Sequence, residues 1–217
     1  LPLACGWLVR RAQEPAPTPP PPAGPVPTRA WELLREPMFR RLLFVNWLQS
    51  SSWDVHAFVL PVLGHERGLG ASAIGAILGV FAVAAALVRV LLPLLAARAT
   101  ERRVILASTA VTVLVFAAYP LLRSPWAMAA CSVTLGLALG AVQPMVMSML
   151  HQITPPQRHG EALGLRLMTI NASSVAMPML FGSLGALVGI GGVFWVIGAV
   201  VALGMPAVRG LHPPSGR

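Results

Sequence analysis

Two ionisable side chains lie within long apolar stretches of this sequence and are the residues best placed to do chemistry. Arg89 is the only ionisable residue from Gly68 to Ala97, and Asp54 is the only aspartate in the chain. If these stretches cross a membrane, each charge costs at least ~2.5–3.5 kcal/mol, so such groups usually face a cavity or pair with one another. Asp54 and Arg89 are therefore expected to serve a binding site, a gate or a contact between helices.

The stretch around Asp54 carries many polar side chains for an apolar run. In an α-helix, residues four apart share one face, and the polar positions here follow that spacing in two adjoining stripes. We expect them to form one polar face that is more than one residue wide. Its members are Asn46, Ser50 and Asp54 in one stripe, and Gln49, Trp53 and His56 in the other.

Arg89 and Asp54 are predicted to lie at similar depths in neighbouring helices. At a rise of 1.5 Å per residue, Asp54 is ~18 Å and Arg89 ~12 Å from the same end of two antiparallel helices. An arginine side chain can reach across the ~6 Å difference, so a direct or water-mediated contact is one interpretation. In the others, Arg89 extends to the membrane surface, Arg89 contacts a substrate or gate, or Asp54 carries protons.

The composition excludes a water-soluble globular protein. Of the 217 residues, 56% are hydrophobic and 11% charged, whereas a soluble domain carries about 25% charged residues. All sixteen basic residues are arginine, which suggests a GC-rich bacterial genome. The net charge of +9 could indicate a nucleic-acid partner, but the arginines stand mostly at the ends of apolar runs, as topology signals do. We therefore expect a lipid bilayer and no nucleic acid as the partner.

Six apolar runs predict an all-α membrane protein with six transmembrane helices. About 20 residues are needed to cross a ~30 Å hydrocarbon core, and each run meets this length within a few residues. Pairs of glycines four apart, such as Gly136 and Gly140, favour close helix packing into one bundle. The predicted spans are about 42–62, 71–97, 104–122, 126–150, 164–188 and 191–208.

Arginine placement predicts that both ends of this bundle are cytoplasmic. Most arginines precede the first span or follow the second, fourth and sixth, and Arg166, near the start of the fifth span, is read mainly as one of these signals. Residues 1–9 are expected to end a preceding transmembrane helix in a chain cut off upstream. Residues 10–41 form a cytoplasmic Pro/Arg-rich linker, 42–208 the bundle and 209–217 a cytoplasmic tail.

This organisation resembles the C-terminal half, helices seven to twelve, of a bacterial major facilitator superfamily transporter. The stretch "RVLLPLLAARATERRVI" (89–105) lies where the family's motif G-x-x-x-D-R-x-G-R-R would be repeated. Its remnant is Arg98, Arg102 and Arg103, without the motif's Gly and Asp. "TPPQRHGEALGLR" (154–166) is similar to the loop before the eleventh helix, and "INASSVAMPMLFGSLGALVGIGGVFW" (170–195) to the last two helices.

The resemblance implies a secondary transporter of the inner membrane that works by alternating access on a small molecule, with an N-terminal six-helix half as its partner. It also implies a substrate cavity lined by the seventh, eighth, tenth and eleventh helices. Asp54 is the candidate for proton coupling, while Asn171 and Ser174 could equally bond neighbouring helices. The cavity candidates are Asn46, Gln49, Ser50, Trp53, Asp54, Arg89, Gln143, Asn171 and Ser174.

The sequence contains no arrangement typical of an enzyme. Ser, Asp and His in "SSSWDVH" (50–56) lie within two helical turns and cannot line up as a catalytic triad. The histidines outside the spans lack metal-ligand spacing, and no phosphate-binding loop is present. No catalytic residue, metal or cofactor is expected. The rival to a transporter is a non-transporting six-helix component such as a scaffold, a channel subunit or a membrane enzyme.

Overall fold

The computed structural model describes residues 30–96 and 100–211, with the side chains of 93–96 excepted, and each element in these ranges is helical, which confirms the all-α class. The expectations for residues 1–29, for Arg98 and for residues 212–217 lie outside the described ranges. The elements are η1 (Ala30–Arg35), α2 (Pro37–Glu66), α3 (Ala71–Ala96), α4 (Glu101–Ala118), η2 (Tyr119–Leu121), α5 (Pro125–Ile153), η3 (Pro156–Arg158), α6 (His159–Leu203) and α7 (Met205–Arg209).

Proline and glycine set several of these boundaries. Pro37 and Pro125 stand at the first positions of α2 and α5, where the missing N–H costs no hydrogen bond. Gly68, between α2 and α3, has a φ of 74°, which L side chains rarely adopt. Gly189, inside α6, has a φ of 76° and a ψ of 160°, so the helix is interrupted there.

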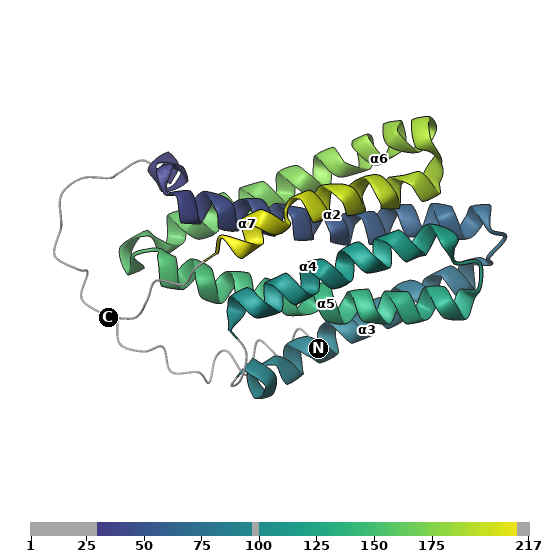
Figure 1. Ribbon diagram of the computed structural model, residues 1–217, viewed down its shortest axis with the longest axis horizontal. Helices are drawn as coiled ribbons and strands as arrows, with labels where there is room; N and C mark the ends of the chain where they lie inside the picture. The colour runs from purple at the N-terminus through teal and green to yellow at the C-terminus, as the bar shows by residue number, and fades with distance from the viewer. Residues whose placement is uncertain (1–29, 97–99, 212–217) are drawn as a thin grey trace, which may run out of the picture.

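The interruption at Gly189 divides α6 into two arms that run in opposite directions, as the light green and yellow ribbons of Figure 1 show. The second arm returns along the bundle, because Gly198 packs against Phe116 of α4 and Gly204 against Leu48 of α2. Figure 1 shows the long helices lying side by side along the longest axis of the molecule. The result is a bundle of long helices joined by short connections.

Four helical stretches of the described chain are long and apolar enough to cross a membrane: Ala71–Leu92, Glu101–Leu121, Pro125–Ile153 and Pro156–Arg209. The last has 54 residues and contains the reversal at Gly189. α2 is not among the four, although its 30 residues are more than the ~20 that a crossing needs. Its polar face lowers its mean hydropathy. The count of six spans therefore stays a prediction for α2 and for the two arms of α6.

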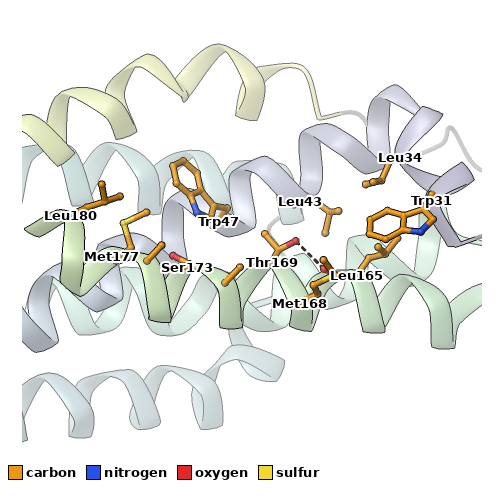
Figure 2. A pocket seen from close by; sticks show the side chains of 12 residues that line it. Trp31, Leu34, Leu43, Trp47, Leu165, Met168, Thr169, Ser173, Met177 and Leu180 are labelled. Atoms are coloured by element: carbon orange, nitrogen blue, oxygen red, sulfur yellow. Dashed lines mark hydrogen bonds between the residues drawn. The ribbon is translucent and has the colours of Figure 1, made fainter.

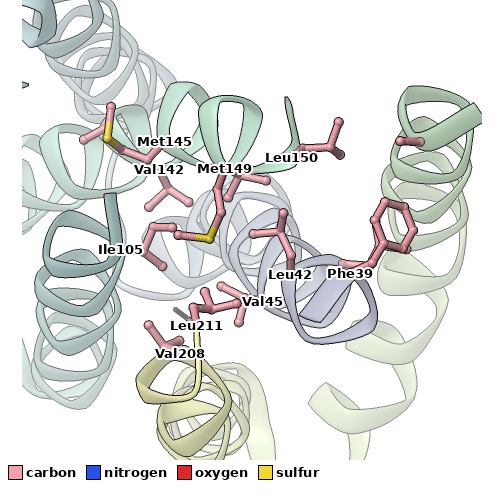
Figure 3. Close-up of a cluster of buried hydrophobic side chains, with 14 of the residues drawn as sticks. Phe39, Leu42, Val45, Ile105, Val142, Met145, Met149, Leu150, Val208 and Leu211 are labelled. Carbon is pink, nitrogen blue, oxygen red and sulfur yellow. The ribbon is translucent and has the colours of Figure 1, made fainter. Parts of the chain in front are cut away.

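Two clusters of buried apolar side chains hold the bundle together, one toward each end. In the first, side chains from α2, α4, α5 and the C-terminal segment point toward one another, including Leu42, Ile105, Met149 and Val208 (Figure 3). The second lies toward the other end of the bundle and includes Phe81 of α3, Phe116 of α4 and Phe194 of α6. Both clusters also contain side chains of α3 and α6. The polar side chains of α2 lie between these two clusters along the helix.

Close packing of α3 on α5 depends on the predicted pair Gly136 and Gly140. A Cβ at Gly136 would lie 2.5 Å from the carbonyl oxygen of Phe81, and one at Gly140 would lie 2.7 Å from the Cα of Ala85. A Cβ built at Gly75 or at Gly79, by contrast, would meet no atom within 4 Å. The small-residue spacing thus marks a real backbone approach in one helix pair, and this approach holds Arg89 of α3 beside α5.

Candidate functional site

Six of the nine predicted cavity residues line one cavity of about 320 Å³, together with Ile170. They come from α2, α3, α5 and α6, which contain the spans that the family resemblance assigns to the seventh, eighth, tenth and eleventh helices. Apart from Ile170 and Trp53, every lining side chain ends in a charged group, a hydroxyl or an amide. The six are Ser50, Trp53, Asp54, Arg89, Gln143 and Ser174.

The carboxylate of Asp54 is nearly buried and weakly bonded. The side chain is 8% exposed, and the Ser173 hydroxyl donates to Oδ2 over 3.5 Å. Ser173 also lies 3.1 Å from the hydroxyl of Ser51, so the contact joins α6 to α2. An oxygen that accepts one long hydrogen bond keeps most of its capacity for another donor. Asp54 is therefore available to a ligand or a proton.

Arg89 reaches the cavity from α3 without an ion pair to Asp54. Its guanidinium carbon lies 5.7 Å from the centre of the Trp53 ring, which is the range of a cation–π contact. Within the described ranges the only ion pair closer than 4.0 Å is Arg158–Glu161. The cost of placing Arg89 in an apolar run is thus offset by an aromatic face and by exposure to the cavity. A water-mediated contact with Asp54 stays a prediction.

Arg166 belongs to the surroundings of the cavity, although its sequence position favoured a topology signal. Its side chain is 9% exposed, Nη2 donates to Oε1 of Gln143, and Nε is buried without a hydrogen-bond partner. The predicted span started at residue 164, but the helix starts at His159, so Arg166 lies about two turns inside it. A predicted helix start near residue 159 would have placed Arg166 inside the helix and not at its end.

The other three candidates lie outside the cavity lining. Gln49 is 3% exposed, and its Nε2 donates to Oγ1 of Thr109 over 2.8 Å, so it joins α2 to α4. Asn46 is fully buried, and neither amide atom has a hydrogen-bond partner among the described residues. Asn171 is exposed on α6. A role in a substrate cavity stays a prediction for these three.

His56 is the centre of a second polar cluster, which has no opening. Its Nε2 lies 2.9 Å from Oγ of Ser132, and the Tyr119 hydroxyl lies 2.5 Å from the same oxygen. Tyr119 also donates to the carbonyl of Met128 over 3.1 Å. The imidazole stacks on Phe81 with ring centres 4.1 Å apart. His56 and Ser132 are fully buried, which fits a cluster that joins helices.

A larger groove of about 430 Å³ runs along η1, α2 and the first arm of α6 (Figure 2). Its lining is almost wholly apolar, with Trp31, Trp47 and Met168 among its side chains. The Thr169 hydroxyl, one of its few polar groups, already donates to the carbonyl of Leu165. Because oriented polar groups give a solute site its specificity, the smaller cavity at Asp54 is the better candidate despite its size.

The motif remnant lies at the start of α4, where Arg102 and Arg103 follow Glu101. The Glu101 carboxylate accepts hydrogen bonds from Ser148 over 3.0 Å and from Gln152 over 2.8 Å. Both donors belong to α5, so the first turn of α4 is fixed to the neighbouring helix. The two arginines remain candidates for a role in this loop.

Comparison with known proteins gives one finding. A family model described as Major Facilitator Superfamily matches residues 42–217, which is most of the chain and includes all residues that line the cavity. No curated protein matches the chain.

Proposed function

The chain belongs to the major facilitator superfamily, and on this premise we propose that it is the C-terminal half of a bacterial secondary transporter that moves a small molecule by alternating access. Membership makes it a multi-pass membrane protein of a transporter family. The observation that carries the finer proposal is the cavity at Asp54. In a bundle whose other helices are largely apolar, four helices place six polar or aromatic side chains around one space of about 320 Å³.

The proposed mechanism needs a second six-helix half, which would cover the cavity from its open side. Two such bundles rock around a site near the middle of the membrane and expose it to each side in turn. Arg89 and Ser174 are exposed here, as side chains that face a partner bundle or a substrate would be. Ser50, Asp54 and Gln143 would orient the substrate, with Asp54 as the candidate proton carrier.

The site can be tested for alternating access without knowing the substrate. In the full-length protein with Cys5→Ser and Cys131→Ser, a Ser174→Cys thiol should react with a membrane-impermeant maleimide in both right-side-out and inside-out vesicles. A scaffold would react from one side at most. A channel would react from both sides but would also give single-channel current steps in planar bilayers, which a transporter does not. Reaction from one side only, or such current steps, would contradict the proposal.

The proposed orientation places both ends of the chain in the cytoplasm. It is supported by the arginines near one end of the bundle, among them Arg102, Arg158 and Arg209, against Arg67 and Arg123 at the other. In intact cells, an impermeant thiol reagent should modify Glu66→Cys and spare Gly160→Cys. Both positions are exposed, and a side chain at Gly160 would meet no atom within 4 Å. The reverse labelling pattern would overturn the orientation.

A further inference from the structure

We infer that the cavity selects small organic anions and that Arg166, together with Arg89, supplies the positive charge that attracts them. The inference rests on the proposed transport function of the same cavity. It concerns the chemistry of the substrate, which neither membership of the family nor the presence of a cavity determines.

Arg166 lies at the edge of the cavity through two independent placements. On α6, Arg166, Ile170 and Ser174 are spaced by four residues and so share one face of the helix. Ile170 and Ser174 line the cavity, which places Arg166 one turn further along the same face. From α5, the cavity residue Gln143 accepts a hydrogen bond from Arg166 Nη2. The guanidinium therefore borders the site.

The guanidinium of Arg166 also has unused donors. It carries five N–H groups, of which the structure pairs one with Gln143, and the buried Nε has no partner. No carboxylate of the described chain lies within 4.0 Å of it. A buried cation without a counter-charge is costly, and a guanidinium fits the oxygen pairs of carboxylates and phosphates. An anionic substrate would supply the missing partner.

The charges around the cavity do not cancel. Arg89 and Arg166 contribute two positive charges, and Asp54 contributes one negative charge. The other carboxylates of the described chain, Glu32, Glu36, Glu66, Glu101 and Glu161, lie in or next to the first or last turns of helices. A cleft with a net charge raises the local concentration of oppositely charged solutes. This half of the protein thus favours a small molecule with an anionic oxygen group.

The test compares two thiol reagents that carry the same reactive methanethiosulfonate group, one with an ethylsulfonate and the other with an ethyltrimethylammonium. The first is itself a small organic anion, and the second is a cation of similar size. The target is an Ile170→Cys thiol, one turn from Arg166, in the full-length protein with Cys5→Ser and Cys131→Ser. Ser72→Cys, at an exposed position outside the cavity lining, normalises the two rates.

The normalised rate should be about tenfold higher for the anionic reagent at Ile170→Cys, and Arg166→Gln should remove most of this preference. Arg166→Lys should retain it, because the charge remains. Arg89→Gln should also lower the ratio of the anionic to the cationic rate, because it removes the other positive charge. Asp54→Asn should raise this ratio, because it removes the negative charge. Arg209→Gln, which removes an exposed arginine of α7, is the matched control and should leave the ratio unchanged.

A preference for the cation, or a ratio that Arg166→Gln and Arg89→Gln both leave unchanged, would overturn the inference. Each variant is first checked for a monodisperse elution profile, and Arg166→Lys and Arg89→Gln decide the outcome if Arg166→Gln does not fold. The measurement does not depend on transport. If the charge preference is absent but Ser174→Cys is labelled from both sides, the anion inference fails and the transport proposal stands. If Ser174→Cys is labelled from one side only but the charge preference is present, the transport proposal fails and the anion inference stands.

Discussion

Asp54 and His56 lie two residues apart on α2 but belong to polar sites of opposite character. His56 is enclosed, bonded to Ser132 and stacked on Phe81, and it lines none of the cavities described above. Asp54 borders a cavity and accepts one long hydrogen bond, from Ser173. The sequence presents both as polar residues in one apolar run. What separates them is the set of partners that other helices bring.

The difference suggests how to distinguish structural from functional polar residues in a membrane bundle. Buried polar groups in folded proteins are nearly always hydrogen-bonded. In the cluster of His56, Ser132 and Tyr119 the fold itself pairs the imidazole Nε2 and both hydroxyls, and only Nδ1 of His56 is left without a partner among the described residues. Arg166 Nε and the hydroxyl of Ser50 are buried without a partner. Groups left unsatisfied beside a cavity await a ligand, water or another part of the protein. The predictions below test this contrast.

His56→Ala is expected to have the largest effect on stability. It removes a fully buried ring and leaves Ser132 and Tyr119 short of a partner, which together should cost about 3 kcal/mol. Unfolding of the full-length protein by sodium dodecyl sulfate measures this loss. The fraction that stays folded should keep the charge preference at Ile170→Cys, and a lost preference would show that the two sites are not separate.

Tyr119→Phe should have an intermediate effect. The ring keeps its stacking on Phe194, whose centre lies 5.0 Å away, but the bonds to Ser132 and to the Met128 carbonyl are lost. The expected cost is about 1–2 kcal/mol, by the same unfolding measurement. A cost equal to that of His56→Ala would mean that the hydroxyl, and not the imidazole, holds the cluster together.

Trp53→Leu should destabilise the protein less and should act through Arg89. The indole contacts Phe81 edge-on with centres 4.6 Å apart and lies under the guanidinium. Loss of the cation–π contact is worth about 0.5–1 kcal/mol at an exposed site. In an Arg89→Gln background this contribution should vanish, so a double-mutant cycle isolates it. Equal costs in both backgrounds would remove the contact from the account.

The smallest effect is expected for the coupling between Asp54 and Arg89. No ion pair joins them within 4.0 Å, so the stability changes of Asp54→Asn and Arg89→Gln should add to within about 0.5 kcal/mol. The sequence had left a direct pair open, and a broken buried pair would cost about 3–5 kcal/mol. A coupling of that size in the unfolding measurement would restore the pair as the explanation for Arg89.

Much of this architecture can be predicted from sequence because hydrophobicity and proline or glycine placement are local signals. They predicted helical structure. The polar positions within the apolar runs, together with the family resemblance, pointed to the helices that border the cavity and to six residues of its lining. Gln49 could not be separated from them, because its partner Thr109 lies 60 residues away. Arg166 was read as a topology signal because helix starts are hard to place, and an error of five residues moved it from the interior to the surface. His56 is enclosed by Ser132 of α5 and Tyr119 of η2, and the sequence near His56 does not show that these distant residues pack against it.

The most direct test of the central claim labels the two polar sites of α2 side by side. In full-length protein with Cys5→Ser and Cys131→Ser, Ser174→Cys reports on the Asp54 cavity, and Ser132→Cys, at a fully buried position, reports on the His56 cluster. An impermeant maleimide should modify the first from both sides of the membrane and the second from neither. The claim that the Asp54 cavity is the site of alternating access would be contradicted if Ser132→Cys were labelled as fast as Ser174→Cys. It would also be contradicted if Ser174→Cys were labelled from one side only.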